Sequence, residues 1–222
     1  MTSLFHHPYC KPYILHPIES IKYFFISLKW AYQRVKRGYC ERDLSEVKDW
    51  FFEIMPEMLN EIKKEKSRIP MECYEEALLA FRLDPVEYWD TCNNDLYSRY
   101  YKQVEELAEK KWDEILSQIA FLLGEANFDT CTKKNPYEDE FHRIRKEFKA
   151  KYGEFGEKLM TKEEKKRAKK GLQKWYFPSD IPEYKEIYES YWDEEKELTE
   201  YRKKCAKEGL ELFVKWFYRL TI

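Results

Sequence analysis

Three arginines and two aromatic residues gather around one glycine near the N-terminus. They are Trp30, Arg34, Arg37, Tyr39 and Arg42, placed on both sides of Gly38. Guanidinium groups bind phosphate oxygens in pairs, helix N-terminal amides favour anions, and a Tyr or Trp ring can stack on a base or a cation. This turn is therefore our candidate ligand-binding site, and the ligand it suggests is a small nucleotide-like anion.

The same turn also has a purely structural interpretation. Gly38 would cap one helix and fix a tight turn into the next, while the arginines would pair with acidic neighbours such as Glu41 and Glu46. For the individual arginines we favour this interpretation. We keep the turn as the best candidate site because charge and aromatic surface converge on it.

Metal chemistry has one candidate location, close to the N-terminus. His6, His7, Cys10 and His16 lie within eleven residues, and imidazole and thiolate are ligands that zinc prefers. Their spacing matches no zinc motif, and three prolines interrupt the segment. We therefore expect residues 1–17 to form an extended arm and assign no metal.

Catalytic motifs are missing from the sequence. It contains no phosphate-binding glycine loop, no nucleophile elbow and no HExxH zinc motif, and His142 is the only histidine within a predicted helix. Asp and Glu are so numerous that a catalytic carboxylate pair cannot be singled out. We assign no catalytic residue and no cofactor, and expect a protein that is not an enzyme.

Charge is balanced overall but strongly segregated along the chain. Forty Lys and Arg face 42 Asp and Glu, which argues against a sequence-blind DNA coat. Residues 143–174 nevertheless carry 13 basic and five acidic side chains, and residues 183–200 carry eight acidic and two basic ones. The basic run Lys162–Lys174, followed by Trp175-Tyr176-Phe177, could bind nucleic acid. We favour the alternative that it packs antiparallel to the acidic segment.

Helical periodicity runs through the whole chain, and no segment alternates like a β-strand. The expected helices cover residues 18–36, 43–62 (opened by an Asp43–Glu46 capping box, with a kink or split at Pro56), 72–81, 85–126 (broken near 93–94), 137–151 and 182–218. In the first, Ile21, Phe24, Phe25, Leu28 and Ala31 or Tyr32 share one face. A capping box at Thr161–Glu164 begins a further helical piece.

These elements predict an all-α fold, a bundle of six to eight helices in a single domain over residues 18–222. Residues 141–200 would form a projecting charged hairpin inserted into that domain. No apolar stretch reaches transmembrane length, no signal peptide is visible, and the six cysteines are dispersed as free thiols of a reducing compartment. We expect a cytoplasmic protein without a membrane partner.

Three motifs carry a likeness to other proteins: RGYxxRD within Lys29–Leu44, WDEI leading into EANxxTC within Trp112–Cys131, and GLELFxKWF within Tyr201–Leu220. In these motifs the chain resembles a family of uncharacterised proteins encoded by tailed phages and prophages of gut bacteria. The segment from Phe141 to Asp180 is long and basic beside the family's usual connector. The resemblance implies a phage gene product acting inside a bacterial host, as an accessory or counter-defence protein, and it brings no activity or site residue with it.

The functional expectation is a non-enzymatic, phage-encoded binding protein that sequesters a small host immune signal of the nucleotide type. Abundant Arg, Tyr and Trp would clamp phosphates and stack bases, and a homo-oligomer would suit this role because pockets between subunits exclude water. One alternative is a protein–protein inhibitor or adaptor of a host factor. A second, less expected, is a nucleic-acid-associated accessory protein that uses residues 161–177.

Overall fold

The computed structural model describes residues 17–45, 47–65, 68–89, 94–168 and 174–220. The predicted arm over 1–17, apart from its last residue, and the group of His6, His7, Cys10 and His16 lie outside these ranges.

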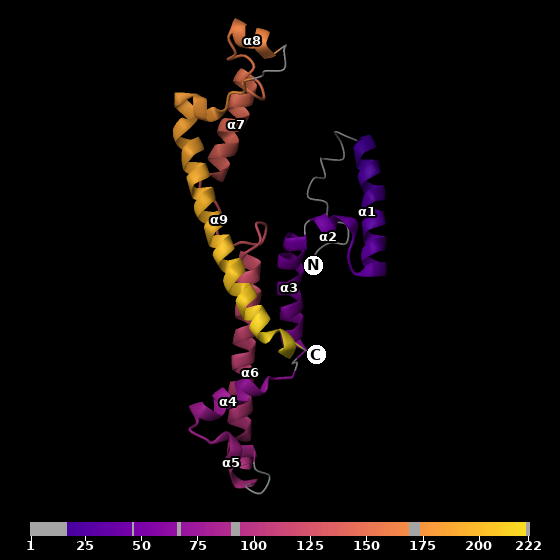
Figure 1. Ribbon diagram of the computed structural model, residues 1–222, viewed down its shortest axis with the longest axis vertical. Coiled ribbons are helices and arrows are strands. Elements are labelled where there is room, and N and C mark those ends of the chain that lie inside the picture. The colour runs from indigo at the N-terminus through magenta and orange to yellow at the C-terminus, as the bar shows by residue number, and fades with distance from the viewer. Residues whose placement is uncertain (1–16, 46, 66–67, 90–93, 169–173, 221–222) are drawn as a thin grey trace. The chain divides into compact units, whose positions relative to one another are not determined.

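The described residues form helices joined by turns and contain no strand, so the predicted all-α class is confirmed (Figure 1). Two short 3₁₀ helices, Pro178–Asp180 and Phe217–Arg219, accompany nine α-helices in this part of the chain. The α-helices are α1 Pro17–Arg37, α2 Glu41–Ser45, α3 Val47–Lys64, α4 Met71–Ala80, α5 Pro85–Trp89, α6 Asn94–Glu125, α7 Glu138–Tyr152, α8 Lys162–Ala168 and α9 Pro182–Trp216.

Several helix ends carry local caps, and those at Gly38 and Thr161–Glu164 were predicted from the sequence. Gly38, with a φ of +80°, follows α1, as expected for a glycine after a helix C-terminus. The Asp84 carboxylate accepts hydrogen bonds from the first N–H groups of α5, with Val86 N at 2.7 Å. Thr161 and Glu164 form the reciprocal capping box of α8, with Thr161 N to Glu164 Oε2 at 2.8 Å and Glu164 N to Thr161 Oγ1 at 3.2 Å.

The second predicted helix is wrong in two details. Asp43 does not open it, because α2 already begins at Glu41 and the Asp43 carboxylate reaches back to accept the Cys40 N–H at 2.8 Å. Of the two outcomes predicted at Pro56, a kink or a split, the split does not occur, since α3 is helical through that proline. The predicted helix is instead two helices, α2 and α3, whose boundary lies ten residues earlier.

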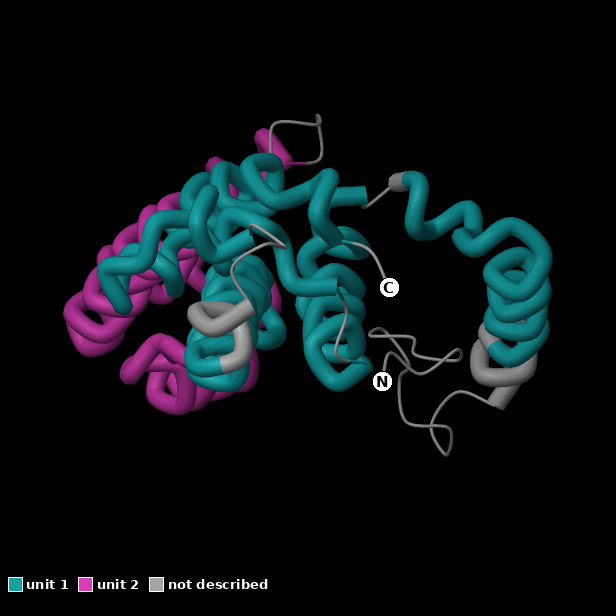
Figure 2. The backbone as a smooth tube through the Cα atoms, turned by 90° about the horizontal axis from the view of Figure 1, so that it is seen from below, with its two compact units in different colours: residues 1–130, 205–222 teal, residues 131–204 magenta. Residues whose placement is uncertain are grey.

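The chain divides into two compact units, drawn in different colours in Figure 2. Unit 1 comprises residues 1–130 and 205–222, and unit 2 comprises residues 131–204. Helix α9 begins in unit 2 and ends in unit 1. The sequence predicted one domain over 18–222 with a hairpin at 141–200, and the range of unit 2 includes that hairpin.

The core of unit 1 is organised along α6, against which α3 and α4 pack. A stripe of buried side chains at spacings of three and four residues forms the inner face of α6: Val104, Ala108, Trp112, Leu116, Ile119 and Leu123. The end of α9 completes this core, where Trp216 lies 5.5 Å from Trp112 and Phe213 lies 5.6 Å from Phe51 between ring centroids. Each fully buried apolar side chain of this kind contributes about 1.5–3 kcal/mol to folding.

Unit 2 has a smaller core, between α7 and the first part of α9. Ile144 and Phe148 of α7 are buried together with Tyr184 of α9. One turn further along, Phe141 stacks on Tyr191 with ring centroids 3.7 Å apart and planes within 7°. Aromatic stacking therefore fixes how α7 and this part of α9 lie against each other.

The charged segments of unit 2 pair differently from the prediction. Lys151 of α7 forms an ion pair with Glu183 of α9 at 2.9 Å, so α7 is the partner of the acidic helix. Pairing between Lys162–Lys174 and that helix is not found among the described residues. Both members of the ion pair are about half exposed, so solvent screens it and it contributes little to stability. The packing of α7 against α9 depends on the aromatic core.

Candidate functional site

Several charged side chains at the turn between α1 and α2 pair with one another. The Arg34 guanidinium donates two hydrogen bonds to the Asp43 carboxylate, Nε to Oδ2 at 3.1 Å and Nη2 to Oδ1 at 2.6 Å. Burial by itself would raise the pKa of Asp43, but the hydrogen bonds from Arg34 and from the Cys40 N–H outweigh it and hold that pKa below its usual range. Arg34 thus ties α2 to the last turn of α1.

Glu41, one of the two acidic partners that the structural interpretation named, is hydrogen-bonded to side chains other than arginine. Glu41 accepts hydrogen bonds from Lys29 Nζ at 2.8 Å and from Gln33 Nε2 at 2.9 Å. Glu46 lies outside the described residues. Asp43 takes the role of arginine partner, because its place on α2 brings it level with Arg34.

None of the five predicted ligand-binding residues lines a cavity found among the described residues. Arg42 and Trp30 are brought together, with the guanidinium carbon 5.9 Å from the ring centroid. Arg37 and Tyr39 are exposed, and Arg34 is turned toward Asp43. The turn therefore offers an exposed arginine and an exposed ring rather than a built pocket.

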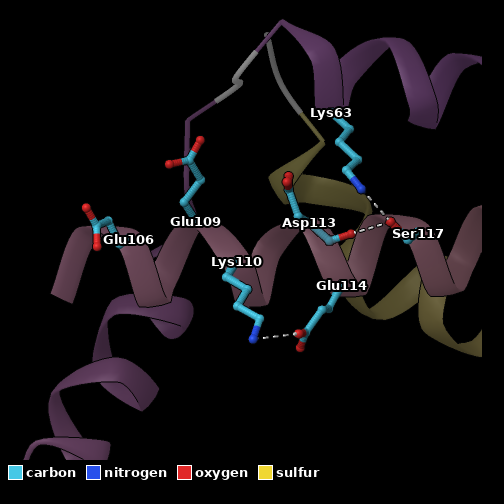
Figure 3. Close-up of a pocket in the computed structure, with 7 residues that line it drawn as sticks. All are labelled: Lys63, Glu106, Glu109, Lys110, Asp113, Glu114 and Ser117. Atoms are coloured by element: carbon cyan, nitrogen blue, oxygen red, sulfur yellow. Dashed lines mark hydrogen bonds and ion pairs between the residues drawn. The ribbon is translucent and has the colours of Figure 1, made fainter. Parts of the chain in front are cut away.

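A groove between α3 and α6, of about 550 Å³, has the wrong charge for a phosphate (Figure 3). The Lys63 ammonium donates to Ser117 Oγ at 2.9 Å, and Lys110 lies 3.9 Å from a Glu114 carboxylate oxygen. Four of its seven lining residues are acidic: Glu106, Glu109, Asp113 and Glu114. In the described parts of the chain, no cluster of His, Cys, Asp or Glu has the arrangement of a metal site, so these carboxylates form an acidic surface.

A cavity of about 470 Å³ within unit 2 is lined mainly by aromatic and basic side chains, in contrast to the acidic groove. Its volume lies in the range of roughly 300–1,000 Å³ that small-molecule sites occupy. Three of its rings, Phe155, Phe177 and Trp192, are 39–44% exposed although they border one hollow. The aromatic lining comes from α7, α9 and the segments between them: Phe141, Phe148, Phe155, Tyr176, Phe177, Tyr188 and Trp192.

The cationic side of this cavity comes from one face of α7. His142, Arg145, Lys146 and Lys149 follow one another at helical spacing and all line it. Lys149 is engaged, because it forms an ion pair with Glu154 at 2.8 Å and lowers the pKa of that carboxyl. Within the described residues, neither Arg145 nor Lys146 forms an ion pair within 4 Å, and the Arg145 guanidinium carbon lies 5.6 Å from the centroid of the Phe141 ring. Two positive charges therefore remain beside the aromatic lining.

One side of this cavity forms where the segment around Gly156 approaches the segment around Tyr176. Gly156 has a φ of +68°, and a Cβ at this position would lie 2.5 Å from the Tyr176 Cβ, so only glycine lets the two segments approach. The Tyr176 N–H donates to the Phe155 carbonyl at 3.1 Å, and its hydroxyl donates to Glu164 Oε1 at 2.9 Å. Hydrogen bonds from the Thr161 N–H and then from Tyr176 lower the pKa of Glu164 to about 2. The carboxylate thus stays charged and holds the ring in place.

The sequence pointed to several residues of this cavity separately but did not place them at one site. It identified Trp175-Tyr176-Phe177 as aromatics next to a basic run, and it placed Arg145 and Lys146 in the basic segment 143–174. The alternation of basic and apolar positions along α7 was the available signal. It could not show that residues 176–178 fold back onto the same face.

Comparison with protein-family models, with curated proteins and with solved structures gave no match. None of the helices in the described ranges combines the length and the hydrophobicity that a bilayer crossing needs.

Proposed function

We propose that this chain is a non-enzymatic binding protein whose unit 2 cavity holds a small ligand that joins a flat ring system to phosphate, such as a nucleotide. The observation that supports this best is the pair Arg145 and Lys146, which line an aromatic cavity and form no ion pair within 4 Å in the described residues. Exposed rings offer stacking surfaces to a base, and guanidinium and ammonium groups bind phosphate.

The biological setting follows from the motif resemblance described above. A protein encoded by a phage or prophage that holds a nucleotide tightly would remove a host immune signal from the cytoplasm of the bacterial cell. Such a role requires binding and slow release and no bond cleavage. Neither a base nor an activated nucleophile is needed, in keeping with the chain's lack of catalytic motifs.

In this proposal the cavity of unit 2 replaces the turn at Gly38 as the principal site. Arg34 is held by a carboxylate, that of Asp43, whereas Arg145 and Lys146 form no such ion pair in the described residues and line the cavity. Arg37, which is exposed and distant in sequence from unit 2, then serves as a matched control for the loss of one surface arginine.

A thermal-shift screen of the purified chain tests the proposal. The panel holds mononucleotides, cyclic di- and trinucleotides and ADP-ribose derivatives, and each hit is recovered after heating and checked for integrity. A ligand present at about a hundred times its Kd adds about 2.7 kcal/mol to stability, a shift of several degrees. A shift with intact ligand supports sequestration, and recovery of a cleaved ligand contradicts the non-enzymatic proposal.

A single-stranded oligonucleotide in the same panel distinguishes the nucleic-acid alternative from the small-ligand proposal. Binding to a nucleic-acid strand weakens steeply with salt because several counterions are released, whereas a mononucleotide that contacts two cations loses much less. If the oligonucleotide binds more tightly than every small nucleotide, the small-ligand proposal is wrong.

A further inference from the structure

In its described part, from Phe24 onward, helix α1 buries a polar side chain and leaves several large apolar side chains exposed, the reverse of a helix on a stable monomer. Gln33 is buried at 9% exposure, and with Lys29 it binds Glu41 of α2. By contrast, the apolar side chains of Val35 and Tyr32 are 80% and 64% exposed. α2 thus satisfies the polar side of α1 and leaves the apolar side to another partner.

The exposed residues of α1 have the spacing of a coiled-coil seam. Phe25, Leu28, Tyr32 and Val35 are separated by three, four and three residues, the alternation of a and d positions in a heptad. All four are exposed, Phe25 at 64% and Leu28 at 40%. We call these four residues the α1 seam. Such a stripe buries its side chains when a second helix lies alongside it.

We infer that the α1 seam pairs with the α1 seam of a second copy of this chain, as a parallel two-helix contact. Two-fold symmetry brings one surface patch against itself, which a heptad stripe allows without further complementarity. This inference does not rest on the proposed ligand function.

The charges beside the seam favour parallel over antiparallel pairing. The e positions are Lys29 and Lys36, and the g positions are Phe24 and Ala31. In a parallel pair each e residue faces a g residue of the other copy, so each lysine stem would lie on an apolar side chain. An antiparallel pair would instead place lysines opposite each other.

The exposed area is sufficient for a specific, reversible contact. A Phe or Tyr side chain that is 53–64% exposed offers on the order of 100 Å². The α1 seam together with Phe24 therefore gives a total of roughly 1,000 Å² over two copies, the lower limit for specific protein interfaces. A contact of this size corresponds to a dimer that dissociates on dilution.

Sedimentation velocity of the full chain between about 5 and 200 µM tests the inference. The wild type should shift from monomer to dimer over this range. Val35→Glu should weaken dimerisation at least tenfold, because it places a charge in the seam. Val86→Glu is the matched control, since Val86 is also 80% exposed but lies on α5. Wild-type monomer at the highest concentration, or equal dimerisation of the two variants, would overturn the inference.

Cysteine cross-linking provides an independent readout that does not depend on destabilising the chain. In a parallel pair the two Val35 side chains meet across the symmetry axis, so Val35→Cys should oxidise to a covalent dimer. Val86→Cys and the wild type, whose own described cysteines are buried, should not. Equal cross-linking of all three proteins, or none with Val35→Cys, would contradict parallel pairing and indicate that another partner covers the seam.

Discussion

Gly209 lets the backbone of α9 lie directly on α6. A Cβ at Gly209 would stand 3.0 Å from Leu123 Cδ2 and 3.1 Å from Leu122 Cβ, closer than ordinary van der Waals contact. Leu123 is completely buried, so it cannot swing away without disturbing the core of unit 1. Gly209→Ala should therefore separate α6 from α9 even though alanine is the better helix former.

The size of the effect follows from two opposing contributions. Replacing glycine by alanine in a helix stabilises by up to about 1 kcal/mol, while overpacking a filled core costs about 1–3 kcal/mol. Because the clash involves a fully buried side chain, we expect Gly209→Ala to lower the free energy of unfolding by about 1–2 kcal/mol. Gly124, on α6, is the control, since a Cβ there meets nothing within 4 Å.

Urea denaturation followed by far-UV circular dichroism measures both variants. Gly124→Ala should be as stable as the wild type or gain up to about 1 kcal/mol, so its midpoint should exceed that of Gly209→Ala. If Gly209→Ala is as stable as Gly124→Ala, the contact between α9 and α6 at this position is refuted.

Three further changes test the local structure. Asp43→Asn, which removes the charge paired with Arg34, should cost about 1.5–3 kcal/mol. Because the folded pKa of Asp43 is lowered, its stabilisation is complete above the unfolded value of about 4 and is lost as pH falls through the folded value. Urea midpoints between about pH 6 and about pH 3 should consequently fall less in the variant. Phe141→Ala, which deletes the stack on Tyr191, should cost about 3–5 kcal/mol and lower the thermal midpoint; an unchanged midpoint would exclude the stack. Thr161→Ala should cost α8 about 1 kcal/mol, seen as faster amide exchange confined to that helix.

Local signals in the sequence predicted the helices and several of their ends. Gly38, Asp84 and Thr161 act through hydrogen bonds or backbone angles within a few residues, so their roles could be read before any packing was known. Asp43 was misassigned because it has the side chain of an N-cap residue while its hydrogen bonds with Arg34 place it inside the next helix.

Periodicity predicts which residues share a helix face, but not what covers that face. Phe24, Phe25 and Leu28 were correctly grouped on α1, yet all three are exposed. The buried side is the one that carries Gln33, whose contact with Glu41 bridges eight residues of the chain. Which side of α1 is buried depends on how the rest of the chain packs against it. The periodicity of α1 alone carries no information about that packing.

The cavity of unit 2 lay beyond sequence reasoning for the same physical reason. It depends on the approach of Gly156 to Tyr176 and on the packing of α7 against α9 through Phe141 and Tyr191. Each contact joins segments separated by twenty or more residues. Composition could indicate aromatic and basic surface there, but only the fold brings Arg145 to that surface.

Isothermal titration of the tightest nucleotide from the thermal-shift panel tests the central proposal most directly. Wild type, the double variant Arg145→Ala/Lys146→Ala and the control Arg37→Ala are compared under identical conditions. Losing two charge-assisted contacts, each of about 1.5–3 kcal/mol, should weaken binding at least a hundredfold, while Arg37→Ala should bind like the wild type. Full affinity in the double variant, or loss of binding in Arg37→Ala, would contradict the assignment of the ligand to unit 2.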